Sequence, residues 1–66
     1  MKAFEIRNMS EQEIRRKLEE SQEELFNLRF QLSIGQVKDV NRISGLKRDI
    51  ARFKTVLKER ELAALQ

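Results

Sequence analysis

Two stretches of this sequence place apolar side chains at alternating steps of three and four residues, which is the spacing of a coiled-coil seam. The first seam consists of Ile14, Leu18, Ser21, Leu25, Leu28 and Leu32. The second seam consists of Ile43, Leu46, Ile50, Phe53 and Leu57. Because the connection between them is short, two helices built on these seams must fold back antiparallel. The pattern therefore predicts an all-α chain in the form of a long, coiled-coil-like, two-helix hairpin.

The register of this hairpin can be checked against side-chain size. Antiparallel pairing sets Leu25 opposite Ile50 and sets Ser21 opposite Phe53. Ser21 is the one small, polar interruption of the first seam, and Phe53 is the largest residue of the second. A small residue facing a large one is what interdigitating layers require, so the register supports the hairpin.

Capping residues predict where the helices begin. Ser10 is followed three residues later by a glutamate, the spacing of a capping box, so the first helix is expected over residues 10–36. Asp39 is suited to cap a second helix, expected over 40–63 after a turn at 37–39. Together these segments predict one helical-hairpin domain.

Residues 1–9 precede the capping box and complete the single domain predicted over 1–66. They contain apolar side chains that can pack on the hairpin. We expect a short helical turn here, folded over the open end of the hairpin near Leu62 and Leu65.

The composition excludes most kinds of chemistry. The chain has no Cys and no His, so it lacks zinc ligands of the Cys/His kind, the commonest catalytic base and the best nucleophile. We expect no enzyme activity, no cofactor, no metal and no small-molecule substrate. No apolar run is long enough for a signal peptide or a membrane span. The expected location is therefore the cytoplasm, without contact to a membrane.

Basic side chains gather on one side of the second helix when it is projected at about 100° per residue. This stripe contains Ser44, Lys47, Arg48, Ala51, Lys54, Thr55 and Lys58, with Arg52 just beyond it. No acidic residue falls inside the arc. One interpretation is a surface that neutralises the phosphates of a nucleic acid. The other is an ordinary solvated helix face, and position alone does not separate the two.

An apolar strip lies on the first helix, away from its seam. Phe26, Phe30 and Ile34 recur every four residues, and an aligned exposed strip typically marks an interaction surface, here for a neighbouring protein or for RNA bases that stack on the two Phe rings, and the three residues are the candidate protein contacts. Arg29 lies on the flank of the seam, where it either contacts phosphate or covers the seam edge. Gly35 either ends the helix or allows close approach of RNA beside Gln36.

Two segments resemble a known family. LFNLRFQLSIGQ, at 25–36, and LKRDIARFKTVLKERE, at 46–61, are similar to large-subunit ribosomal protein twenty-nine of bacteria, and so is the opening MKAFEIRNMSEQEI. The matching motif residues are Arg29, Phe30, Gln31, Gly35, Gln36, Lys47, Arg48, Asp49, Ala51 and Arg52. At the hairpin tip the chain departs from the family, with Asp39-Val40 in place of the usual Asn or Lys followed by Pro, Ser or Thr.

The resemblance implies a structural constituent of the large ribosomal subunit that supports translation. It would bind large-subunit rRNA near the polypeptide exit tunnel, beside large-subunit ribosomal protein twenty-three. The residues expected to bind rRNA are Arg29, Gln31, Gln36, Lys47, Arg48, Arg52, Lys54 and Lys58. The alternative is a free-standing helical-hairpin regulator that dimerises into a four-helix bundle through the apolar strip.

Overall fold

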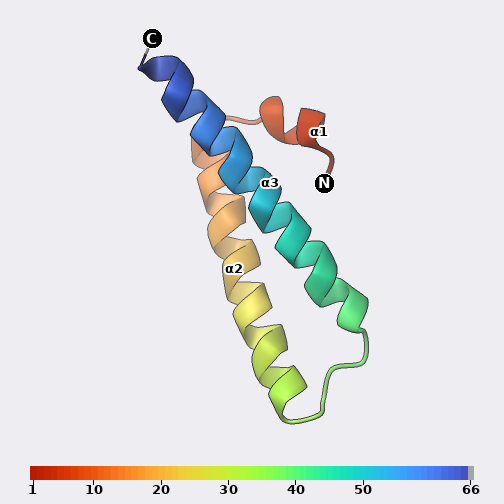
Figure 1. The fold of residues 1–66 in the computed structure, drawn as a ribbon. Coiled ribbons are helices and arrows are strands. Elements are labelled where there is room, and N and C mark those ends of the chain that lie inside the picture. Colours follow the sequence, from red (N-terminus) through yellow and green to blue (C-terminus); the bar gives the residue numbers. More distant parts are fainter. Residues whose placement is uncertain (66) are drawn as a thin grey trace.

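Two long antiparallel helices form the body of the molecule, and a short helix lies across one of them (Figure 1). The computed structural model describes residues 1–65, and its long axis measures 48 Å. Helix α1 spans Ala3–Arg7, α2 spans Glu11–Ser33 and α3 spans Val40–Ala64. The predicted all-α hairpin with a short N-terminal helical segment is therefore confirmed.

Side-chain caps begin both long helices. The Ser10 hydroxyl accepts a hydrogen bond from the Glu13 backbone N–H at 3.1 Å. An Asp39 carboxylate oxygen accepts one from the Asn41 N–H at 2.9 Å. Each cap satisfies a backbone donor that has no partner within its helix. The two residues chosen from the sequence as caps thus act as caps.

Helix α2 ends at Ser33, earlier than the expected end at residue 36. Gly35 adopts φ +74°, a left-handed conformation that residues with a Cβ rarely take. This turn lets the Gln36 N–H donate to the Gln31 carbonyl at 2.8 Å and the Gly35 N–H donate to the Leu32 carbonyl at 3.0 Å. The pair of bonds is a Schellman motif. Of the two roles proposed for Gly35, the structure therefore shows the one at the end of the helix.

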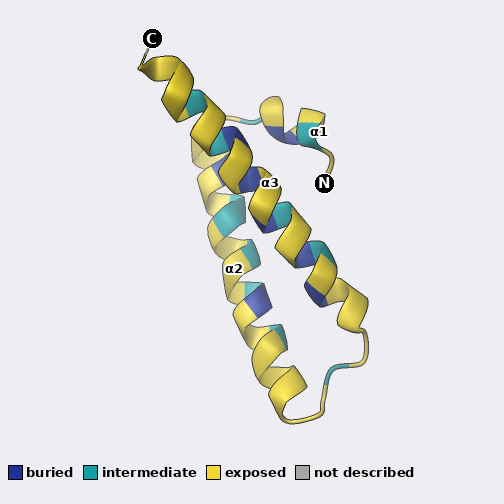
Figure 2. Ribbon diagram, in the orientation of Figure 1, coloured by how far each residue is buried: buried dark blue, intermediate teal, exposed yellow. Residues whose placement is uncertain are grey.

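The core is divided into two clusters along the α2–α3 seam, and buried positions follow the facing sides of the helices (Figure 2). The cluster near the connecting loop contains Leu25, Ile43, Leu46 and Ile50. The cluster near the open end contains Ile6, Ile14, Phe53 and Val56. Partly buried Leu18 packs against both clusters and makes the apolar seam continuous.

The structure corrects the seam at both ends. Leu32 is 48% exposed, and Val37 from the connecting loop packs against the adjacent cluster instead. The cause is the early end of α2, which brings the loop back over the seam. At the other end Val56 is buried while Leu57 is only partly buried. Val56 faces α1, which the spacing of the seam could not indicate.

Helix α1 packs beside α3 near the open end of the hairpin, but against Phe53 and Val56 rather than against the last turn of α3. Ile6 is fully buried and packs in the cluster of Phe53 and Val56. Leu62 and Leu65, the expected contacts of the N-terminal segment, are 51% and 79% exposed. The expected contacts with Leu62 and Leu65 are therefore wrong, because Ile6, the buried side chain of α1, inserts against Phe53 and Val56.

Replacing Ile6 tests this docking. Ile6→Ala should lower the free energy of unfolding by roughly 2–5 kcal/mol, because it removes a fully buried side chain. Phe4→Ala, in the same helix at a position 60% exposed, should change it by less than about 0.5 kcal/mol. Urea unfolding followed by circular dichroism measures both. Equal effects of the two substitutions would contradict the docked position of α1.

Candidate nucleic-acid interface

Helix α1 covers one flank of α3, where the N-terminal segment forms ion pairs with α3. The Met1 amino group lies 2.8 Å from an Asp49 carboxylate oxygen, and Arg7 lies 3.3 Å from Glu59. On the same side, Arg42 of α3 donates two hydrogen bonds to one Glu24 oxygen and a third to the other. The carboxylates named here, on what we call the α1 flank, are thus neutralised within the molecule.

Two further arginines of α3 hold the N-terminal segment in place. Arg52 donates to the Met1 carbonyl at 2.7 Å. Arg60 donates to the carbonyls of Arg7 and Met9 at 3.0 and 2.6 Å. Arg52 is one of the predicted rRNA-binding residues, and the structure engages its guanidinium in an internal contact. Arg52 lies just beyond the basic stripe, on the side of α3 that faces the N-terminal segment.

The opposite flank of α3 carries basic side chains, most of them without such partners among residues 1–65. Lys47 and Lys54 are seven residues apart, so they lie on one face two turns apart. Arg29 of α2 lines the same hollow as Lys54. Among residues 1–65, none of these three makes an ion pair. We call Arg29, Lys47, Lys54 and Lys58 the open flank.

A shallow hollow lies on the open flank midway along the hairpin. Its lining consists of Gln22, Leu25, Phe26, Arg29, Ile50 and Lys54. Gln22 was outside the predicted site, although its position four residues before Phe26 and seven before Arg29 places it on this flank. The structure thereby brings one aromatic ring of the first helix next to a cation of the second.

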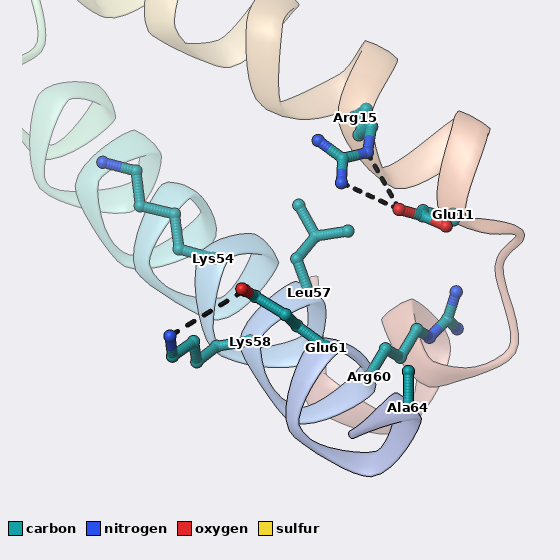
Figure 3. A pocket seen from close by; sticks show the side chains of 8 residues that line it. All are labelled: Glu11, Arg15, Lys54, Leu57, Lys58, Arg60, Glu61 and Ala64. Atoms are coloured by element: carbon teal, nitrogen blue, oxygen red, sulfur yellow. Dashed lines mark hydrogen bonds and ion pairs between the residues drawn. The ribbon is translucent and has the colours of Figure 1, made fainter.

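A second hollow lies at the open end of the hairpin, and two ion pairs form along its lining (Figure 3). Arg15 pairs with Glu11 at 2.8 Å, and Lys58 lies 3.8 Å from Glu61. Leu57 lies between the two pairs in this view. On the open flank, Lys58 therefore has a carboxylate partner, whereas Arg29, Lys47 and Lys54 form no ion pair among residues 1–65.

The remaining predicted rRNA-binding residues lie elsewhere. Gln31 and Gln36 line a hollow at the connecting loop, together with Arg42 of the α1 flank. Arg48 is exposed and forms no ion pair with any residue in the described part of the chain. The predicted set therefore does not form one continuous surface: only Arg29, Lys47, Lys54 and Lys58 gather on the open flank.

The apolar strip of α2 winds away from the open flank. Phe26, Phe30 and Ile34 are 72%, 61% and 51% exposed. Each step of four residues advances about 400° around the helix, so the strip turns by about 40° per step. Phe26 lines the hollow, whereas Phe30 is further around the outer face, and Ile34 is the C-cap residue that follows α2. The strip therefore offers one residue to the hollow and two to the outer surface.

The described helices lack the features of two other classes of site. Across residues 1–65, no three side chains of the metal-binding types lie close enough together to hold a metal ion. In the same range no helix has the length and apolar character needed to span a membrane.

Comparison with known proteins places this geometry in context. The family model described as Ribosomal L29 protein matches residues 4–60. Three proteins named "Large ribosomal subunit protein uL29" are similar over nearly their full lengths. The Finegoldia magna protein is 55% identical over 62 residues, covering 94% of this chain and 91% of its own. The Geobacillus stearothermophilus protein is 55% identical over 64 residues, covering 97% of each chain. The Thermotoga maritima protein is 53% identical over 62 residues, covering 94% of each chain.

Arg52 and Arg48 form a matched pair for testing what holds α1. Arg52→Gln should increase the opening of α1 about fivefold, because it removes a hydrogen bond worth roughly 1 kcal/mol. Arg48→Gln changes charge equally and should leave α1 unaffected. Native-state exchange of the Ile6 amide, which donates to the Lys2 carbonyl at 3.3 Å, reports this opening. Equal exchange rates in the two variants would show that Arg52 does not hold α1.

Proposed function

This chain belongs to the ribosomal L29 protein family, and we propose that its open flank binds large-subunit rRNA. Membership of this family makes the chain a structural constituent of the large ribosomal subunit rather than an enzyme. The observation that carries the proposal is the separation of charge across α3. On the α1 flank Asp49 and Glu59 pair with cations. On the open flank Arg29 and Lys54 have no carboxylate partner among residues 1–65. RNA phosphates supply the missing counter-charge.

Small side chains beside the open flank favour a close approach of the RNA backbone. Ala51 and Thr55 lie next to the lysines on α3, and both are exposed. The Thr55 hydroxyl donates to the Ala51 carbonyl at 2.8 Å, so it already has a partner within the helix. Because Ala51 and Thr55 are short, the longer lysine side chains extend beyond them and can contact the phosphates.

A protein neighbour is proposed for the outer face of α2. The family resemblance implies a position near the polypeptide exit tunnel, beside large-subunit ribosomal protein twenty-three. The strip Phe26–Phe30–Ile34 is the candidate contact, and its exposed side chains support this assignment. Phe30 and Ile34 lie furthest from the basic open flank, so they carry the protein contact in this proposal.

Removing cations from each flank in turn tests the RNA surface. For large-subunit rRNA, log affinity falls as log salt concentration rises. The double variant Arg29→Gln/Lys54→Gln should make this slope less steep, by about 0.7–0.9 per lost phosphate contact. The control Arg7→Gln/Arg42→Gln makes the same charge change on the α1 flank and should leave the slope nearly unchanged. Filter binding across a salt series measures both. The same slope in both doubles would refute the assignment to the open flank.

Crosslinking tests the protein neighbour. A photo-reactive phenylalanine analogue at position 30 should crosslink to large-subunit ribosomal protein twenty-three in assembled large subunits. The same analogue at Glu20, beside the α1 flank, serves as the control and should not crosslink to that protein. A crosslink from position 30 to a second copy of this chain, with a dimer in sedimentation, would instead favour the four-helix-bundle regulator.

A further inference from the structure

The hollow on the open flank combines an apolar floor with a cationic rim. Leu25 and Ile50 are 9% and 8% exposed and form its base where the two helices meet. Phe26, Arg29 and Lys54 stand around this base, and the Phe26 ring is 72% exposed. The lining contains no carboxylate. Such a site fits a ligand that has both a flat apolar part and negative charge.

We propose that this hollow holds one unpaired RNA nucleotide, with its base stacked on Phe26 and its flanking phosphates bound by Arg29 and Lys54. This inference rests on the proposed binding of large-subunit rRNA by the open flank. Unpaired bases are recognised by stacking on aromatic side chains while cations hold the backbone. Gln22, on the rim, supplies a side-chain amide that can donate to or accept from the base edge.

Other occupants leave part of the hollow unused. An apolar side chain from a neighbouring protein would pack on Phe26 but would leave Arg29 and Lys54 without counter-charge. A regular RNA duplex would supply phosphates, but its bases are stacked inside the helix and cannot cover the Phe26 ring. An unpaired nucleotide satisfies both requirements at once, since it carries an exposed base between two phosphates.

Tryptophan fluorescence detects such stacking directly. The chain has no Trp and no Tyr, so Phe26→Trp places a single indole on the rim of the hollow. Its emission should be quenched when the full chain binds large-subunit rRNA stripped of proteins, because the indole stacks on a base. Phe30→Trp, one turn further along the same strip, is the matched control. It should be quenched far less, because residue 30 is turned away from the hollow.

Affinity measurements provide a second readout on the same rRNA. Phe26→Leu keeps an apolar side chain but removes the ring, and it should weaken binding on the order of 5- to 150-fold. It should leave the salt dependence unchanged, since stacking involves no counterion release. Phe26→Trp should bind as tightly as the unmodified chain. Because position 26 is exposed, the helical content by circular dichroism should be equal in all three chains.

The outcomes separate this inference from the function on which it rests. If the unmodified chain binds rRNA while Phe26→Trp is not quenched and Phe26→Leu binds equally well, the nucleotide site is wrong and rRNA binding stands. If the unmodified chain does not bind rRNA, both proposals fail. If Phe26→Leu weakens retention in assembled large subunits but not binding to bare rRNA, a protein occupies the hollow and the inference is overturned.

Discussion

Burial of the Phe53 side chain is the interaction through which all three helices are joined. Phe53 belongs to α3, and it packs in one cluster with Ile14 of α2 and Ile6 of α1. These three are the largest side chains that are fully buried. Ser21 lines a hollow beside Phe53, and its small size leaves room for the ring between the long helices. A larger residue at position 21 would push α2 away from α3 and weaken the packing of α1 against Phe53.

The docking of α1 also leaves α3 with two different flanks, one whose charged side chains are paired and one whose charged side chains are mostly unpaired. On the covered flank, Asp49, Glu59 and Arg60 all have partners in the N-terminal segment. On the opposite flank, Lys47 and Lys54 have none among the described residues. Charges on one side therefore stabilise the fold, and charges on the other remain available for phosphates. Without the N-terminal segment, Asp49 and Glu59 would lose these partners.

The candidate site was only partly predictable for the same reason. Helix periodicity alone identifies Lys54, because it places Lys54 on one side of α3 with Lys47 and Lys58. Arg52 was grouped with it because it lies next to that face, but the Met1 carbonyl engages its side chain. Gln31 and Gln36 match the family motif, yet they lie at the loop with Arg42 rather than beside Lys54. Proximity in sequence or on a helical wheel does not reveal which residues a second helix brings together.

The sequence by itself determined the hairpin, its register and its caps. Ser10, Asp39 and Gly35 act on backbone groups no more than three residues away, and the seam repeats every three or four residues. Only the tertiary structure decided where α1 docks, and hence that Val56 is buried and that Arg52 is engaged. Those contacts join residues 51 or 52 positions apart, as in the Arg52–Met1 hydrogen bond and the Arg7–Glu59 pair. Periodicity determines on which face of its helix a side chain lies. Which element packs on that face depends on how segments distant in the sequence come together.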